Sequence, residues 1–353
     1  MKVFRTSILF TIFALFLAFF VGFYDRTSGG FVLESGMKAL FIAFVLTVLE
    51  VSLSFDNAVV NASLLETMTP VWQRRFLTWG ILIAVFGMRL IFPLAIVGFI
   101  AKIGPIEALQ LSWFEPEKYA EIMLSTHHIV SAFGGAFLLM VCMSYFYDPD
   151  KKIHWLSPLE RVWVKLGKME AFELAIVLTI FIVLSRLMPE GERMEYLIAA
   201  LWGIVVFVIV DGFASLFEDE TVGHGHGPSA GVVQAARGGL GVFLYLEVLD
   251  ASFSFDGVVG AFAITQNLFI IMLGLGAGAF FVRSITIYLV QKKTLHQFKF
   301  LEHGAFYAIG ALAWIMILSP FFHVSEWITG FVGVLILGVS IWASRESQGA
   351  AER

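Results

Sequence analysis

Six acidic side chains fall inside strongly apolar segments of this chain of 353 residues: Glu50, Asp56, Asp211, Glu247, Asp250 and Asp256. A charge in the middle of a bilayer is costly, so carboxylates at that depth normally face a partner or a water-filled cavity. The basic residues at a comparable depth are Arg89 and Arg283. The acidic residues outnumber them, and cations or protons are expected to neutralise the remaining charge.

The ligand atoms that these segments offer are mainly oxygens. Besides the six carboxylates there are backbone carbonyls and four polar side chains, those of Ser52, Asn57, Asn61 and Ser252. Such ligands suit Mn²⁺, Mg²⁺ or Ca²⁺ better than Zn²⁺ or Cu⁺. Cys142 is the only cysteine, which excludes an intrachain disulfide and a thiolate metal site within one chain. We therefore expect a transported divalent cation and no tightly bound cofactor.

Five further residues are candidates for supporting roles. Arg89 and Arg283 are expected to pair with the acidic residues when no cation is bound. Asp211 is a candidate third ligand, proton carrier or helix-end residue. His127 and His303 are equally consistent with interfacial hydrogen bonding and with proton relay or metal ligation.

The elements that must position these residues are membrane-spanning helices. Hydrophobic residues make up 59% of the chain and charged residues 14%, which indicates a bilayer protein. Apolar stretches predict about ten spanning helices, near residues 7–24, 38–66, 75–101, 122–146, 170–188, 195–217, 236–265, 268–291, 303–319 and 325–343. The fold class expected is an all-α polytopic membrane protein.

The distribution of Lys and Arg predicts the orientation. On the ten-span scheme, more than twice as many basic residues lie on the side of the N-terminus as on the other side, so both termini are expected in the cytoplasm. The polar loops 147–169 and 218–235 then also lie there. The first helix is expected to be retained, because no small-residue cleavage site follows it. No basic run suggests nucleic-acid binding.

An internal repeat relates the acidic residues to one another. Residues 46–59 align with residues 246–259 at a shift of 200, with eight of fourteen positions identical and Glu50 opposite Asp250. The similarity resumes downstream, where Arg89 matches Arg283 and His127 matches His303. Five predicted crossings separate the copies, so they run in opposite directions, as in transporters with inverted repeats. The expected halves are 1–188 and 189–353; the alternative is a duplicated hairpin kept for packing.

The two aligned segments, 46–59 and 246–259, are the two copies of one motif, and each copy contains an aspartate, Asp56 or Asp256. Each aspartate is followed by a residue that readily adopts the left-handed conformation, Asn57 or Gly257. In an unbroken helix, residues six apart are rotated by about 240°, so Glu50 and Asp56 would not face one site. We therefore expect breaks near residues 54–57 and 254–257. The alternative is that Asn57 and Gly257 only allow close helix packing.

The segment Leu-Glu-Val-Ser-Leu-Ser-Phe-Asp-Asn at 49–57, its echo at 249–257 and Arg89 resemble the TerC-like integral membrane proteins, and most closely a bacterial branch of formerly unknown function. The resemblance covers nearly the whole chain. It implies a divalent-cation transporter of the bacterial inner membrane, with manganese export as the activity. The metal-site residues that it implies are Glu50, Asp56, Asn57, Asp250 and Asp256, with Glu247 an additional acid and Gly257 a departure from the motif.

The function expected from the sequence is manganese efflux by alternating access at a mid-membrane carboxylate site, with protons as a candidate coupling ion. One alternative is a proton-coupled exporter of a small organic cation or amino acid. An intramembrane aspartyl protease is disfavoured because neither Asp56 nor Asp256 follows a Gly-x-Gly element, so we expect no enzyme. A structural membrane protein that binds partners through 147–169 is a further alternative. The lipid bilayer and metal ions are the partners expected, and the oligomeric state is left open.

Overall fold

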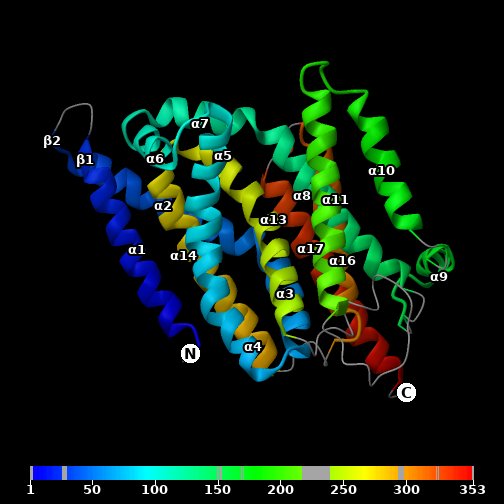
Figure 1. Ribbon diagram of the computed structural model, residues 1–353. Coiled ribbons are helices and arrows are strands. Elements are labelled where there is room, and N and C mark those ends of the chain that lie inside the picture. The colour runs from blue at the N-terminus through cyan, green and yellow to red at the C-terminus, as the bar shows by residue number, and fades with distance from the viewer. Residues whose placement is uncertain are drawn as a thin grey trace. The chain divides into compact units, whose positions relative to one another are not determined.

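The computed structural model describes residues 3–25, 30–148, 151, 153–167, 169, 171–216, 239–292, 298–322, 324 and 326–351 (Figure 1). Almost all of them are helical. The exception is a short antiparallel pair, β1 (Tyr24–Asp25) with β2 (Gly30–Phe31), in the turn that follows the first helix. The loop at 218–235 lies outside the described residues.

Ten helices or helical stretches correspond to the ten predicted spans. They are α1 (Arg5–Phe23), α2 (Leu33–Leu53) with α3 (Phe55–Thr67), the stretch Pro70–Ala101, α8 (His127–Tyr147), α10 (Phe172–Ser185), α11 (Arg193–Leu216), α13 (Leu240–Ile264), α14 (Leu268–Lys292), α16 (Leu301–Leu318) and α17 (Glu326–Ala351). Within the described residues, eight segments are long and apolar enough to cross a membrane. The fold class is therefore confirmed as an all-α, multi-pass membrane protein.

The stretch Pro70–Ala101 is not one regular α-helix. It consists of α4 (Pro70–Arg75), two π-helical segments, η1 (Phe76–Gly80) and η2 (Ile83–Ile91), and α5 (Phe92–Ala101). It ends at Lys102, whose φ of 54° is left-handed. π-Helical turns are rare and are frequently found at functional sites. The wide turns of η2 carry Arg89.

Three further helices lie where the sequence predicted mainly loops: α6 (Pro105–Phe114), α7 (Pro116–Ser125) and α9 (Ser157–Leu166). Each has a proline in its first turn, where the missing N–H costs no intrahelical hydrogen bond. The start of the predicted helix 122–146 belongs to α7, since α8 begins only at His127. These helices are too short to have been found by a search for membrane spans.

The chain packs into two units. The first unit comprises Met1–Phe55, Leu77–His127 and Phe253–Tyr288, and the second comprises Asp56–Phe76, His128–Ser252 and Leu289–Arg353. The chain passes from one unit to the other between Phe55 and Asp56 and again between Ser252 and Phe253, within the two motif copies. Each unit therefore draws on both halves of the repeat.

Small residues allow close packing in the first unit. Ala18 of α1 and Ala39 and Ala43 of α2 form a buried cluster with Ile270 of α14, and α1 lies along α2 in Figure 1. The hydroxyl of Ser7 on α1 donates to the carbonyl of Phe280 on α14 over 2.7 Å. Small residues at helix contacts are typical of membrane proteins, where dispersion contacts drive association.

The second unit has α8 at its centre, with most of its residues buried. Gly134 and Gly135 of α8 lie against Met316 and Ile317 of α16, where a larger side chain would collide with them. The hydroxyl of Tyr196 on α11 donates to the carbonyl of Ile317 over 3.0 Å. The hairpin of α10 and α11 belongs to the same unit (Figure 1).

Candidate functional site

The first motif copy is broken as predicted. Helix α2 ends at Leu53, Ser54 has φ −99° and ψ 18°, and α3 begins at Phe55. The Ser54 hydroxyl donates to Oε1 of Glu50 over 3.0 Å. The break places Asp56 in the first turn of α3, where unpaired backbone N–H groups and the helix dipole favour a carboxylate.

The second motif copy is not broken, so the prediction for residues 254–257 was wrong. Helix α13 runs from Leu240 to Ile264 without interruption. The Ser252 hydroxyl donates to the Val248 carbonyl of its own helix over 2.9 Å. A Cβ on Gly257 would lie 3.6 Å from Oε2 of Glu50, so this glycine leaves room for a neighbouring side chain and does not supply a left-handed turn. The close-packing alternative holds for this copy.

Glu50 and Arg89 form a buried ion pair in the first unit. Glu50 is 4% exposed and Arg89 is 2% exposed. Nη2 of Arg89 lies 2.5 Å from Oε1 of Glu50, and Nη1 donates to the carbonyl of Ala84 within η2. Gly278 of α14 packs so closely on Glu50 that a Cβ there would collide with it. The predicted pairing of Arg89 with a motif carboxylate is confirmed.

Asn57 and Asp250 join the two motif copies within the second unit. The Asn57 side-chain amide donates to Oδ1 of Asp250 over 2.5 Å, from α3 to α13. Asp56 and Asn57 are both buried, and the Asn57 backbone N–H donates to Oδ1 of Asp56 over 2.9 Å. Asn61, one turn further along α3, is also buried.

The buried side-chain oxygens of the second unit that accept no hydrogen bond include Oδ1 of Asn57, Oδ1 of Asn61, Oδ1 of Asp211 and Oε1 of Glu247. Buried polar atoms of native proteins nearly always have a partner, so each of these acceptors requires an explanation. A bound cation, or a hydrogen-bond donor such as water, would satisfy any of these oxygens, and a proton would satisfy the carboxylates of Asp211 and Glu247. In the first unit, Nε of Arg89 and Nε of Arg283 are buried donors without an acceptor.

Glu173 is a buried acid that the sequence reasoning missed. It lies in the first turn of α10 and is 6% exposed. It interacts electrostatically with Asp211 of α11, so these two are a pair of interacting buried acids in the second unit. The available signal was that Glu173 is an acidic residue inside the predicted helix 170–188. Because it lies near the end of that segment, its position alone does not distinguish it from a residue outside the membrane core.

Other predicted site residues are not brought together. Among the described residues, no three His, Cys, Asp or Glu side chains gather closely enough to hold a metal ion. Ser52 is exposed and its hydroxyl donates to Val48 of its own helix over 2.8 Å. Asp256 lies on α13, but its side chain is outside the described part of the structure.

Residues at equivalent positions of the two repeats have different surroundings in the structure. Arg283 lies on α14, and no ion pair joins it to a described carboxylate. His127 is the first residue of α8, while its repeat equivalent His303 lies in the first turn of α16 and is buried. The pairing predicted for Arg283 stays a prediction.

The sequence from residue 55 to residue 349 matches a family described as a protein of unknown function, DUF475. The chain belongs to the DUF475 family. No curated protein and no solved structure matches it. The matched region begins at the first residue of α3 and reaches into α17, so it contains Asp56, Asn57 and the whole second motif copy, but not Glu50.

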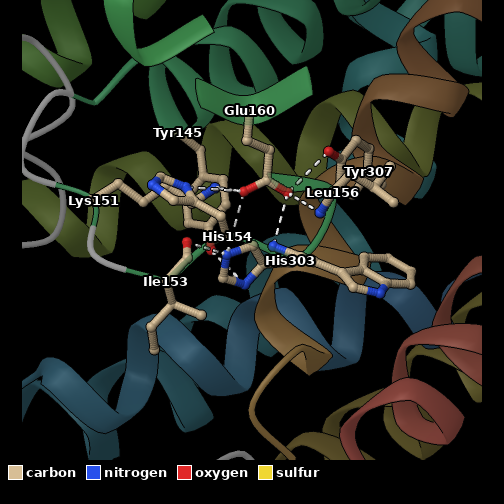
Figure 2. A network of polar contacts seen from close by, with 9 residues as sticks. Tyr145, Lys151, Ile153, His154, Leu156, Glu160, His303 and Tyr307 are labelled. Carbon is tan, nitrogen blue, oxygen red and sulfur yellow. Dashed lines mark hydrogen bonds and ion pairs between the residues drawn. The ribbon is translucent and has the colours of Figure 1, made fainter. Parts of the chain in front are cut away.

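A second polar cluster of this DUF475 protein surrounds Glu160 of α9 (Figure 2). Glu160 is 0% exposed. Its Oε1 accepts the backbone N–H groups of Trp155 and Leu156 over 3.2 and 3.0 Å and the hydroxyl of Tyr307 over 3.0 Å. Its Oε2 faces Nζ of Lys151 at 3.4 Å. The connection after α8 and the helix α9 are thereby attached to α16.

The histidines of this cluster are structural. Nε2 of His303 donates to the carbonyl of Ile153 over 2.8 Å, so Nδ1 is the acceptor for the Tyr145 hydroxyl at 3.3 Å. With both ring nitrogens engaged, His303 has none left for a metal ion. Nδ1 of His154 faces Oε2 of Glu160 at 3.4 Å. Of the readings left open for His303, buried hydrogen bonding fits these contacts.

Lys151 is held in the same cluster by charge and by aromatic rings. Its Nζ lies 4.1 Å from the ring centre of Tyr145 and 4.2 Å from that of Phe146. Burial lowers the pKa of Lys151 to about 8, although Glu160 opposes the shift. Burial would raise the pKa of Glu160, but the Leu156 N–H and Lys151 hold it below its ordinary value.

Proposed function

We propose that this DUF475 protein is a membrane transporter of divalent metal cations. The observation that carries the proposal is the surplus of buried oxygen acceptors in the second unit. Asn57, Asn61, Asp211 and Glu247 each have an oxygen without a donor. Among the described residues, no Lys or Arg forms an ion pair with Asp56, Asp211 or Asp250.

A divalent cation is the ligand whose chemistry best suits oxygens of this kind. Carboxylate and amide oxygens are preferred by hard cations, which take six or more oxygen ligands and can retain waters. A transported ion must also leave its site, which favours a partly hydrated ion over complete coordination by protein. Manganese is the first candidate, from the TerC resemblance, and Mg²⁺ and Ca²⁺ share the same ligand chemistry.

The two units differ in how they compensate their motif carboxylates. In the first unit, Arg89 neutralises Glu50. Among the described residues of the second unit, Asp250 has only the neutral amide of Asn57 as a hydrogen-bond partner. Since a neutral amide leaves the negative charge of Asp250 in place, the second unit is where we assign the cargo.

The proposed direction of transport is efflux, and protons are the proposed coupling ion. The proposed location is a bacterial inner membrane, with both termini of the chain in the cytoplasm. The inverted repeat expected from the sequence supports transport by alternating access, since other transporters with inverted repeats work in this way.

Transport into proteoliposomes tests this proposal. Purified protein would be offered Mn²⁺, Mg²⁺, Ca²⁺ and Zn²⁺ in turn, with and without a pH gradient. We expect transport of at least one of the first three, and its loss in Asp250→Asn. The matched control is Glu117→Gln, which removes an exposed carboxylate on α7.

Two outcomes would contradict the proposal. Equal activity of Asp250→Asn and Glu117→Gln would show that Asp250 is not part of the cation site. Absence of transport for every cation, together with proton-coupled movement of an organic cation or amino acid, would favour the organic-solute exporter.

A further inference from the structure

Helix α9 presents three different faces. At about 100° per residue, Leu159 and Arg161 lie about 100° to either side of Glu160, with Val162 beyond Leu159 and Lys165 beyond Arg161. Glu160 is buried, and Trp163 on the same side of the helix packs against Tyr307 and Phe146. Leu159 and Val162 are exposed by 43% and 52%. Arg161 and Lys165 are exposed as well.

The Glu160 cluster fixes the rotation of α9 about its axis. Oε1 of Glu160 accepts the Tyr307 hydroxyl of α16 and two backbone N–H groups just before α9 (Figure 2). A buried carboxylate with several donors is costly to withdraw. The helix therefore cannot roll to hide Leu159 and Val162, so their exposure is a built feature of the fold.

The place of α9 in the chain puts it at a membrane surface. It lies in the connection, residues 148–171, between α8, an apolar helix long enough to span the bilayer, and α10, a shorter apolar helix. A helix so connected stays near the level where α8 ends. Helices that lie in the interface carry apolar residues toward the acyl chains and Lys or Arg toward the headgroups.

We propose that α9 is a lipid-binding helix that recognises anionic phospholipids. Leu159 and Val162 enter the boundary of the acyl chains, and Arg161 and Lys165 bind headgroup phosphates. The two basic residues lie together on the flank next to the apolar face, so the charges of the surface complement an anionic leaflet. Glu160 of α9 is hydrogen-bonded to Tyr307 of α16. The binding of lipid to α9 is therefore transmitted to α16, a helix of the second unit. This inference does not depend on the transported substrate.

Spin-label accessibility in nanodiscs tests the proposal on the full chain. With Cys142 replaced by Ala, a nitroxide is placed at Val162→Cys or, as an exposed reference on α7, at Lys118→Cys. Collision with oxygen reports the acyl region, and collision with a water-soluble nickel chelate reports the aqueous phase. Discs of phosphatidylcholine alone are compared with discs that also contain phosphatidylglycerol.

We expect the label at 162 to collide with oxygen and to be protected from nickel, and to move deeper when phosphatidylglycerol is present. Replacing Arg161 and Lys165 with Gln should abolish that lipid dependence, whereas Lys102→Gln should preserve it. Nickel access at 162 equal to that at 118 in both lipids would overturn the proposal. Protection from both oxygen and nickel would show a protein partner or a second copy on this face and would overturn it too.

Discussion

The side-chain amide of Asn57 in the first motif copy donates to the carboxylate of Asp250 in the second, over 2.5 Å. Two segments separated by almost two hundred residues thus share one buried hydrogen bond within the second unit. Hydrogen bonds to a charged group contribute about 1.5–3 kcal/mol, more than neutral ones. This contact is therefore the first to test.

Asn57→Ala and Asp250→Asn should not be additive in the free energy of unfolding. Each single change removes one partner, and residues in contact typically couple by about 0.5–3 kcal/mol. Denaturant unfolding in detergent of both single variants and the double variant measures the coupling. Additivity within error would mean that this hydrogen bond contributes nothing to stability.

Arg89→Gln should destabilise the protein strongly. Removing one partner of a buried ion pair leaves the other charge uncompensated, at a cost of about 3–5 kcal/mol. The double change Arg89→Gln with Glu50→Gln should recover much of that loss. Arg283→Gln is the matched control, and a loss of stability there as large as that of Arg89→Gln would argue that Arg283 has an equivalent partner.

Asp56→Asn should abolish cation transport while the protein remains folded and inserted. The change keeps the size of the side chain but removes a negative charge that a divalent cation needs. Initial rates of Mn²⁺ transport in proteoliposomes, normalised to inserted protein, measure the effect. Ser52→Ala should leave the rate unchanged because Ser52 is exposed and donates to its own helix. Normal transport by Asp56→Asn would remove Asp56 from the site.

Lys151 should titrate near pH 8. Because burial lowers its pKa from 10.5 to about 8, the unfolded chain holds this proton more tightly, and stability should rise as the pH increases from about 8 to 10.5. Glu160→Gln should move the midpoint lower, since Glu160 favours the charged lysine. The ¹³Cε shift of Lys151, assigned with Lys151→Arg, reports the titration. An unchanged midpoint in Glu160→Gln would show that the two charges do not interact.

At acid pH, Glu160 determines whether the stability of the protein rises or falls with pH. Its pKa is held below the ordinary value, so its contribution to stability is present above about pH 4.5 and is lost as the pH falls through the lowered pKa. The denaturant midpoints of unfolding of the unmodified protein and of Glu160→Gln should therefore converge at pH values below the lowered pKa of Glu160. Parallel curves down to the lowest pH would contradict this assignment.

Hydropathy was sufficient to predict the long apolar helices, because each spanning segment must be long and apolar irrespective of its neighbours, but it did not predict α6, α7 and α9. It could not predict whether each motif breaks. Asn57 and Gly257 both tolerate a left-handed turn, but Gly257 is used for close packing beside Glu50, which depends on a distant part of the chain. The attachment of α9 through Glu160 to Tyr307 was equally inaccessible, since nothing local to residues 157–166 indicates that contact.

The π-helical segment η2 limits the sequence changes that this region can tolerate. Residues beyond a deletion in a helix rotate about its axis, by about 100° per residue removed in an α-helix and by less in the wider turns of a π-helix. Deleting one residue between Ile83 and Arg89 would therefore turn the guanidinium away from Glu50 and leave a buried carboxylate unpaired. Apolar exchanges within η2 should be accepted readily, whereas a change of its length by one residue should not. Related sequences should accordingly vary here in composition and keep the same number of residues.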